Sequence, residues 1–430
     1  MESIQTAKPR DVAARARECV AEQYREVRGF TDRLCVPLAI EDYVVQSMPD
    51  ASPTKWHLAH VSWFFQTFVL EPAARGARAG RPEYKYLFNS YYNAVGPMYS
   101  RPRRGMLSRP TVSEVRDYRR DIDNAMIEFI ETVGEREWSR ARPIVTLGLN
   151  HEQQHQELIL TDLKHMLSLN PLRPAYIAGE PSLHTDSPEL EWIGFGENVY
   201  WIGAGEEDFF FDNEAPRHRT FVHAFELASR PTTVGEFIEF VEGGGYQRPE
   251  LWLSAGWAAV QENGWGAPLY WEKIDGEWNC FTLAGMRPLN SAEPVCHLSY
   301  FEADAFARWR GARLPSEAEW EVASETIPIA GNFAESGRFH PAPLGRNGAP
   351  LAAIFGDVWE WTRSSYEPYP GYRAAAGALG EYNGKFMSGQ YVLRGGSCAT
   401  PRSHIRRTYR NFFAPDKRWQ FSGVRLARDA

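Results

Sequence analysis

The chain has 430 residues, enough for two or three domains with large apolar cores. Its 47 Lys and Arg residues against 55 Asp and Glu give a formal net charge of −8, which argues against a nucleic-acid partner. The sequence has no apolar run long enough for a membrane span, and residues 1–10 have no signal core. The five cysteines are scattered and odd in number, as in proteins of a reducing compartment. We expect a cytoplasmic protein.

The first part of the chain is predicted to be helical. Apolar residues recur with a 3.6-residue period over 11–30, 54–70, 111–133 and 142–169, and the last run is interrupted at Gly148. Four long helices predict an up-and-down four-helix bundle. The connection 71–110 is rich in Gly, Pro, Tyr and Arg, and long loops on rigid scaffolds are often functional.

Pro and Gly interrupt the pattern between residues 170 and 182, and we place a linker there. The predicted domains are therefore 1–175 and 185–430. In the second domain, short apolar stretches alternate with Gly, Pro, Asn and Asp, which is typical of an α+β domain rich in loops. Helices are predicted over 233–242, 299–308 and 316–323, the last beginning with a capping box between Ser316 and Glu319.

Three histidines indicate a metal site. His151 and His155 are four residues apart, so they share one face of a helix and can converge on a single ion. His60 has Trp56 at i−4, which places it in an apolar interior where a histidine needs a partner. His57 is the alternative third ligand, and we favour His60. Three neutral imidazoles leave coordination positions open, the pattern of a catalytic metal, and their chemistry permits zinc, iron, copper or nickel.

The second domain resembles the formylglycine-generating, sulfatase-modifying-factor domain, which is related to the C-type lectin fold. Most of the matching residues determine the fold, because the tryptophans belong to the core and the glycines to turns. The matching segments are VYWIG at 199–203, DNEAPRH at 212–218, FIEF at 237–240, GGY at 244–246, PV at 294–295, RLPSEAEWE at 313–321, GDVWEW at 356–361, RGGS at 394–397 and GVR at 423–425.

The helical domain, with its three histidines, is similar to a DinB-type bundle. The two domains in this order resemble the sulfoxide synthases of ergothioneine biosynthesis, non-haem iron enzymes that use O2 to join a thiol to hercynine (Nα-trimethylhistidine). The resemblance implies Fe(II) as cofactor. Formylglycine generation is excluded, because that reaction uses two cysteines near the C-terminus, whereas Cys398 has no cysteine near it in sequence. We interpret Cys398 as a small packed residue.

The resemblance also implies residues that bind hercynine. Gln154, beside His155, provides an amide that can both donate to and accept from the imidazole. Asn411 matches an Asn that binds the carboxylate. Phe412 occupies a position where relatives carry Trp, and an aromatic face attracts a trimethylammonium group. Tyr382 matches a further aromatic residue near the same substrate.

Arg101 and Arg104 match an Arg-x-x-Arg pair that clamps the carboxylate of the thiol substrate. Phe413 replaces an Asp found in relatives that use γ-glutamylcysteine. Without that carboxylate the glutamyl amine loses a partner, so we expect free cysteine as the thiol.

One catalytic position departs from the better-known branch of the family. That branch has a tyrosine where this chain has Leu379, which cannot donate a proton. General acid help must come from within hydrogen-bond reach. The loop 71–110 supplies two adjacent phenols, and we expect Tyr92, or else Tyr91, to be the donor.

The favoured function is an iron- and O2-dependent sulfoxide synthase that makes hercynylcysteine sulfoxide. Three alternatives stay open within enzymes: the same reaction with γ-glutamylcysteine, an ovothiol-type synthase acting on histidine, and a DinB-like thiol transferase that uses zinc. A non-catalytic metal- or ligand-binding module is the alternative from another class.

Overall fold

The computed structural model describes residues 9–73, 81–179, 187–205, 209–345 and 350–430. Two compact units make up the chain, 1–159 and 160–430. The predicted domain limits, 1–175 and 185–430, remain a prediction, and part of the expected linker lies outside the described residues. Within the described ranges, no helix is both long and apolar enough to cross a membrane.

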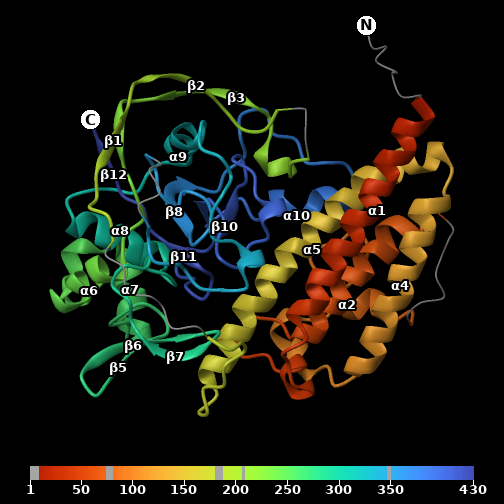
Figure 1. Cartoon of the computed structure of the whole chain (residues 1–430), viewed down its shortest axis with the longest axis horizontal. Coiled ribbons are helices and arrows are strands. Elements are labelled where there is room, and N and C mark those ends of the chain that lie inside the picture. The colour runs from red at the N-terminus through yellow and green to blue at the C-terminus, as the bar shows by residue number, and fades with distance from the viewer. Residues whose placement is uncertain (1–8, 74–80, 180–186, 206–208, 346–349) are drawn as a thin grey trace, which may run out of the picture. The chain divides into compact units, whose positions relative to one another are not determined.

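The first unit is helical, as predicted. Every residue of α2 is buried, so this helix forms the centre of the bundle. A π-helical turn, Gln66–Leu70, continues α2, and two 3-10 turns lie at Ile40–Tyr43 and Arg101–Met106. The helices are α1 (Pro9–Leu34), α2 (Thr54–Phe65), the short α3 (Tyr84–Leu87), α4 (Val112–Thr132) and α5 (Glu135–Leu169), of which the four long ones are seen in Figure 1.

Helix α5 differs from its prediction at two points. It begins at Glu135 rather than at residue 142, and it continues through Pro143 and Gly148 without a break. The reason for a glycine at 148 is close packing: a Cβ there would lie 2.5 Å from Cε1 of Phe65 and 2.9 Å from Cε1 of Phe64. Atoms of two side chains do not approach so closely. Gly148 therefore allows α5 to lie directly against α2.

A buried ion network holds α5 one turn further along, at Glu152. The carboxylate of Glu152 is fully buried and accepts hydrogen bonds from Arg28 and Arg119, both at 2.8 Å, and from the hydroxyl of Thr31 at 2.7 Å. Burial alone would raise the pKa of Glu152, but the two guanidinium groups outweigh it and lower the pKa to about 2. Glu152 thus links α5 to α1 and α4, and it is a structural anion rather than a base.

The second unit combines short strands with short helices, as predicted for an α+β domain. Its strands form sheets in the orders β1-β4-β12, β10-β9-β8-β11, β2-β3 and β5-β6-β7. The strands are β1 (Trp192–Phe195), β2 (Asn198–Ile202), β3 (His218–Val222), β4 (Phe225–Ala228), β5 (Trp271–Ile274), β6 (Glu277–Thr282), β7 (Gly285–Pro288), β8 (Trp359–Ser365), β9 (Tyr391–Arg394), β10 (Asn411–Phe413), β11 (Ser422–Gly423) and β12 (Ala427–Asp429).

The predicted helices of this unit are present, and the capping box of Ser316 and Glu319 is confirmed. Helix α7 was not predicted, and it contains Gly256. A Cβ at this glycine would lie 2.8 Å from Cγ of Phe301, so the glycine is needed for packing. The helices are α6 (Val234–Glu242), α7 (Ser254–Asn263), α8 (Tyr300–Trp309), α9 (Glu317–Ser324) and α10 (Glu381–Gly384).

The core of the second unit contains the tryptophans of the sequence motifs. Trp320, Trp359 and Trp361 are fully buried, as predicted. The indole N–H of Trp320 donates to Glu360 at 2.7 Å, and Glu360 also accepts from Nε of Arg425 at 2.8 Å. The motif residues therefore bind one another inside the unit and determine its fold.

Candidate metal centre

Three histidines of the first unit converge in its interior. His60 comes from α2, and His151 and His155 come from adjacent turns of α5. Nε2 of His151 lies 3.2 Å from Nε2 of His60 and 3.1 Å from Nε2 of His155. Their ligand atoms all lie within 4.8 Å of one another, and all three side chains are buried. The structure therefore brings together the three histidines that the sequence indicated, in an arrangement that fits a single metal ion.

The surroundings of His60 fix its orientation and its tautomer. Its Nδ1 lies 2.6 Å from the carbonyl oxygen of Phe88, which can only accept, so Nδ1 carries the proton and Nε2 is left with a lone pair. The ring stacks between Trp56 at 4.6 Å and 14° and Trp63 at 5.6 Å and 16°. His60 thus presents a nitrogen lone pair toward His151.

The three imidazoles are held in their neutral form. Burial, reinforced by His151, lowers the pKa of His60 well below its usual range. Burial likewise lowers the pKa of His151 to about 4 and that of His155 well below its usual value. At neutral pH the set therefore offers unprotonated nitrogens, which metal binding requires.

His57 does not join the three. Its Nδ1 lies 2.8 Å from Nδ1 of His155, on the side of that ring away from the cluster nitrogen Nε2. From the sequence alone, His57 was considered only as an alternative to His60 as the third metal ligand. The acceptor for His60, the Phe88 carbonyl, has no sequence signal at all, because every residue has such a group.

The two predicted arginines differ in their surroundings. Arg104 is buried, donates to the hydroxyls of Ser52 and Ser90, both at 2.9 Å, and lies 3.3 Å above the ring centroid of Trp56. Arg101 is half-buried and donates to the backbone carbonyl of Asp50. The guanidinium group of Arg104 is thus engaged by protein groups, and Arg101 is the more accessible cation.

The two candidate tyrosines also occupy different places. The hydroxyl of Tyr91 accepts a hydrogen bond from Arg101 at 2.6 Å. Tyr92 is buried, with its ring 5.8 Å from Trp63 and 5.1 Å from Phe68. Trp63 in turn stacks on His60, so the Tyr92 ring lies one aromatic layer from the histidines.

Gln154 lies on α5 between His151 and His155 and is half-buried. The remaining candidates belong to the second unit. Asn411, Phe412 and Phe413 form β10, and Tyr382 lies in α10. The Asn411 carboxamide oxygen accepts from the backbone N–H of Phe412 at 2.9 Å.

The ring of Phe412 belongs to an aromatic group. It stacks on Tyr366 at 4.1 Å and 10° and lies 5.7 Å from Phe386. Phe413 packs edge-on against Trp419 at 5.5 Å. Leu379, in the 3-10 turn Ala378–Gly380, is half-buried. These contacts place an aromatic wall on β10.

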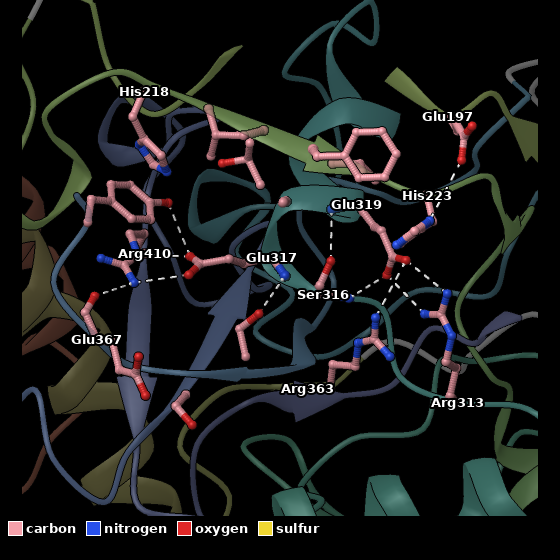
Figure 2. A pocket seen from close by; sticks show the side chains of 18 of the residues that line it. Glu197, His218, His223, Arg313, Ser316, Glu317, Glu319, Arg363, Glu367 and Arg410 are labelled. Atoms are coloured by element: carbon pink, nitrogen blue, oxygen red, sulfur yellow. Dashed lines mark hydrogen bonds and ion pairs between the residues drawn. The ribbon is translucent and has the colours of Figure 1, made fainter. Parts of the chain in front are cut away.

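A separate cavity of about 840 Å³ lies in the second unit (Figure 2). Glu317 receives Nε and Nη2 of Arg410 at 2.8 and 3.0 Å, and Glu319 receives both Nη atoms of Arg313 at 2.9 and 2.8 Å. None of the candidate site residues is among the described residues that line this cavity. These two ion pairs join lining residues to one another, which fits a structural role.

Two family models match the chain, one in its helical part and one in its second part. Residues 23–159 match the DinB superfamily model. Residues 188–343 and 330–430 match the model of the sulfatase-modifying factor enzyme 1-like domain.

Three similar proteins extend over most of the chain. The hercynine oxygenase of Mycolicibacterium smegmatis is 33% identical over 447 residues, which cover 96% of this chain and 99% of that protein. The hercynine oxygenase of Mycobacterium tuberculosis is 33% identical over 89% of this chain and 92% of its own length. Ergothioneine biosynthesis protein 1 of Schizosaccharomyces pombe is 28% identical over 89% of this chain and 52% of that protein. The chain consists of a DinB-superfamily bundle followed by a sulfatase-modifying-factor domain, and it belongs to the hercynine oxygenase family.

Proposed function

We propose that the protein is a non-haem Fe(II) enzyme that uses O2 to join cysteine to hercynine, giving hercynylcysteine sulfoxide in ergothioneine biosynthesis. The observation that carries the proposal is the cluster of three buried neutral histidines in a chain 33% identical to a hercynine oxygenase over 96% of its length. Neither part would suffice alone, because the histidines permit several metals and the similarity by itself names no ligand.

The metal ligands of the proposal are His60, His151 and His155. Three neutral nitrogens leave the charge of a divalent ion uncompensated and leave coordination positions for anionic or neutral ligands such as a thiolate and O2. Iron, when bound, supplies the one-electron chemistry that O2 requires. The protein contributes the fixed orientation of the ligands and an interior that excludes water.

Hercynine binding is assigned to Gln154, Asn411, Phe412 and Tyr382. The half-buried amide of Gln154 comes from the helix that carries two ligands, which supports a role near the imidazole. The aromatic wall around Phe412 supports cation–π attraction for the trimethylammonium group, which cannot donate a hydrogen bond. The carboxamide of Asn411 has an N–H2 group that suits a carboxylate.

Cysteine binding is assigned to Arg101, Arg104 and Phe413. Arg101 is the better carboxylate anchor, because it is half-buried whereas Arg104 is buried. Phe413 cannot pair with a glutamyl amine, which supports cysteine over γ-glutamylcysteine.

The proton donor of the proposal is Tyr92, with Tyr91 as the alternative. The hydroxyl of Tyr91 already accepts from Arg101, so this phenol is tied to the proposed thiol anchor. Tyr92 packs against Trp63, the neighbour of His60. As the general acid, the Tyr92 hydroxyl has to come within hydrogen-bond reach of the reacting sulfur or oxygen atom, and Tyr92→Phe tests this role.

The proposal is tested by anaerobic reconstitution with Fe(II), followed by addition of O2, cysteine and hercynine and mass spectrometry of the products. A mass equal to cysteine plus hercynine, less two hydrogens and plus one oxygen, is expected, and it should be absent in His151→Ala. Preference for histidine over hercynine would indicate the ovothiol-type reaction. Thiol transfer with zinc, without O2 uptake, would indicate the transferase. Metal binding without any turnover would indicate a non-catalytic binding module.

A further inference from the structure

His57 is a buried histidine of α2 that the proposed chemistry does not use. Its side chain is 2% exposed, and it precedes the ligand His60 by one turn of α2. Its Nδ1 lies 2.8 Å from Nδ1 of His155, a full hydrogen-bond contact between two imidazoles. A neutral imidazole has one donor and one acceptor nitrogen, so one ring of the pair must donate and the other accept.

The position of His155 decides the direction of this bond once a metal is present. Nε2 of His155 lies among the cluster nitrogens, 3.1 Å from Nε2 of His151. A metal takes the lone pair of that Nε2, so the single ring proton of neutral His155 must be on Nδ1. Nδ1 of His155 then donates, and Nδ1 of His57 accepts. The reverse arrangement would put the proton on Nε2 of His155 and prevent ligation.

We infer that His57 is a positioning residue that fixes the ligating tautomer and the ring orientation of His155, and that it is not itself a ligand. The inference rests on the proposed metal site. It gives His155 the same kind of support that the Phe88 carbonyl gives His60 at 2.6 Å. Ligating histidines usually donate their second ring N–H to such an acceptor, and loss of the acceptor typically weakens metal affinity about 10–100-fold.

Two substitutions of His57 distinguish the effect of losing the hydrogen-bond acceptor from the effect of losing the volume of the imidazole ring. In His57→Asn the amide oxygen stands close to the position of Nδ1 and can still accept. In His57→Phe the ring remains but the acceptor is lost. The affinity of the apoprotein for Zn(II), measured by competition with a chelator, should fall about 10–100-fold in His57→Phe. It should stay near that of the unmodified protein in His57→Asn.

Nitrogen-15 histidine NMR of the Zn(II)-loaded protein gives a readout that a purely structural role would not change. We expect the His155 ring to show metal-bound Nε2 and protonated Nδ1, with Nδ1 of His57 unprotonated. Circular dichroism checks that the variants fold, and His404→Asn in the second unit is a control for loss of a buried histidine.

The outcomes are distinguishable from failure of the proposed function. No Zn(II) binding by the unmodified protein, or unchanged binding in His151→Ala, would contradict the metal site itself. Normal binding with equal affinity in His57→Phe would overturn the role of His57. An equal loss in His57→Asn and His57→Phe would also overturn it, because the acceptor would then not be the property that matters.

Discussion

Gly148→Ala tests whether the approach of α5 to α2 builds the metal centre. The new Cβ would lie 2.5 Å from Cε1 of Phe65 and 2.9 Å from Cε1 of Phe64, and both rings are fully buried. Carbon atoms in contact prefer about 3.5–4.0 Å, so a ring or the helix must move by about 1 Å. A functional site tolerates displacements of only about 0.5 Å. The substitution should therefore disturb the geometry of His60 against His151.

The stability change has two opposing parts. Replacing a glycine inside a helix by alanine favours the helix by about 1 kcal/mol. Overpacking a filled core costs about 1–3 kcal/mol. The net loss is therefore about 0–2 kcal/mol, or at most about 8 °C in melting temperature at about 2–4 °C per kcal/mol for a unit of this size. The Zn(II) affinity should fall more clearly than the stability, because the displaced helix carries two of the three proposed ligands.

Gly29→Ala is the matched control. Gly29 also lies inside a helix of the first unit, but a Cβ there meets only Nη1 of Arg33 at 3.6 Å, an ordinary contact. This variant should be stabilised by about 1 kcal/mol with unchanged metal affinity. Thermal unfolding and chelator competition measure both quantities. If Gly148→Ala behaved like Gly29→Ala, close packing of α2 and α5 would not be what positions the ligands.

Further variants test the buried anion, the thiol anchors and the proton donor. Glu152→Gln should lower the free energy of unfolding by about 3–5 kcal/mol, because two arginines lose their buried counter-charge; near-normal stability would contradict this. Since the folded pKa of Glu152 is about 2 against an ordinary 4.5, its contribution is complete above pH 4.5 and declines as pH falls toward 2, which acid-unfolding curves of both proteins measure. Arg101→Ala should mainly raise KM for cysteine, whereas Arg104→Ala should also weaken Zn(II) binding through the Trp56 stack; identical kinetic profiles would refute the distinction. Tyr92→Phe should keep the fold and the metal but lower sulfoxide formation about 10²–10⁴-fold or divert O2 to oxidation of cysteine alone, and an unchanged product ratio would exclude it as donor.

The local signals were enough to predict the helical bundle and most helices of the second unit. The i, i+4 spacing of His151 and His155 is a property of any α-helix, so one face of α5 could be identified without a structure. Capping boxes such as Ser316 with Glu319 are likewise local, since each side chain bonds a backbone group three residues away. Recognition of both halves also came from motifs that are continuous in sequence.

The role of Gly148 was misjudged because it depends on a residue far away in the chain. Gly148 suggested an interruption, since in isolation glycine disfavours a helix. Its role depends on Phe65, which packs against it from α2. Only the tertiary structure decides whether a glycine ends a helix or lets a neighbour approach.

The surroundings of the histidines also show what the sequence determines and what only the tertiary structure decides. Sequence identified which residue types converge, because apolar periodicity tells which face of a helix is buried. It could not assign the partner of each ring nitrogen, since those partners are a backbone carbonyl at Phe88 and a second imidazole at His57. It also could not foresee that Arg104 is engaged by Ser52, Ser90 and Trp56. Hydrogen bonds of this kind join groups far apart in the chain, so they exist only after the helices have packed.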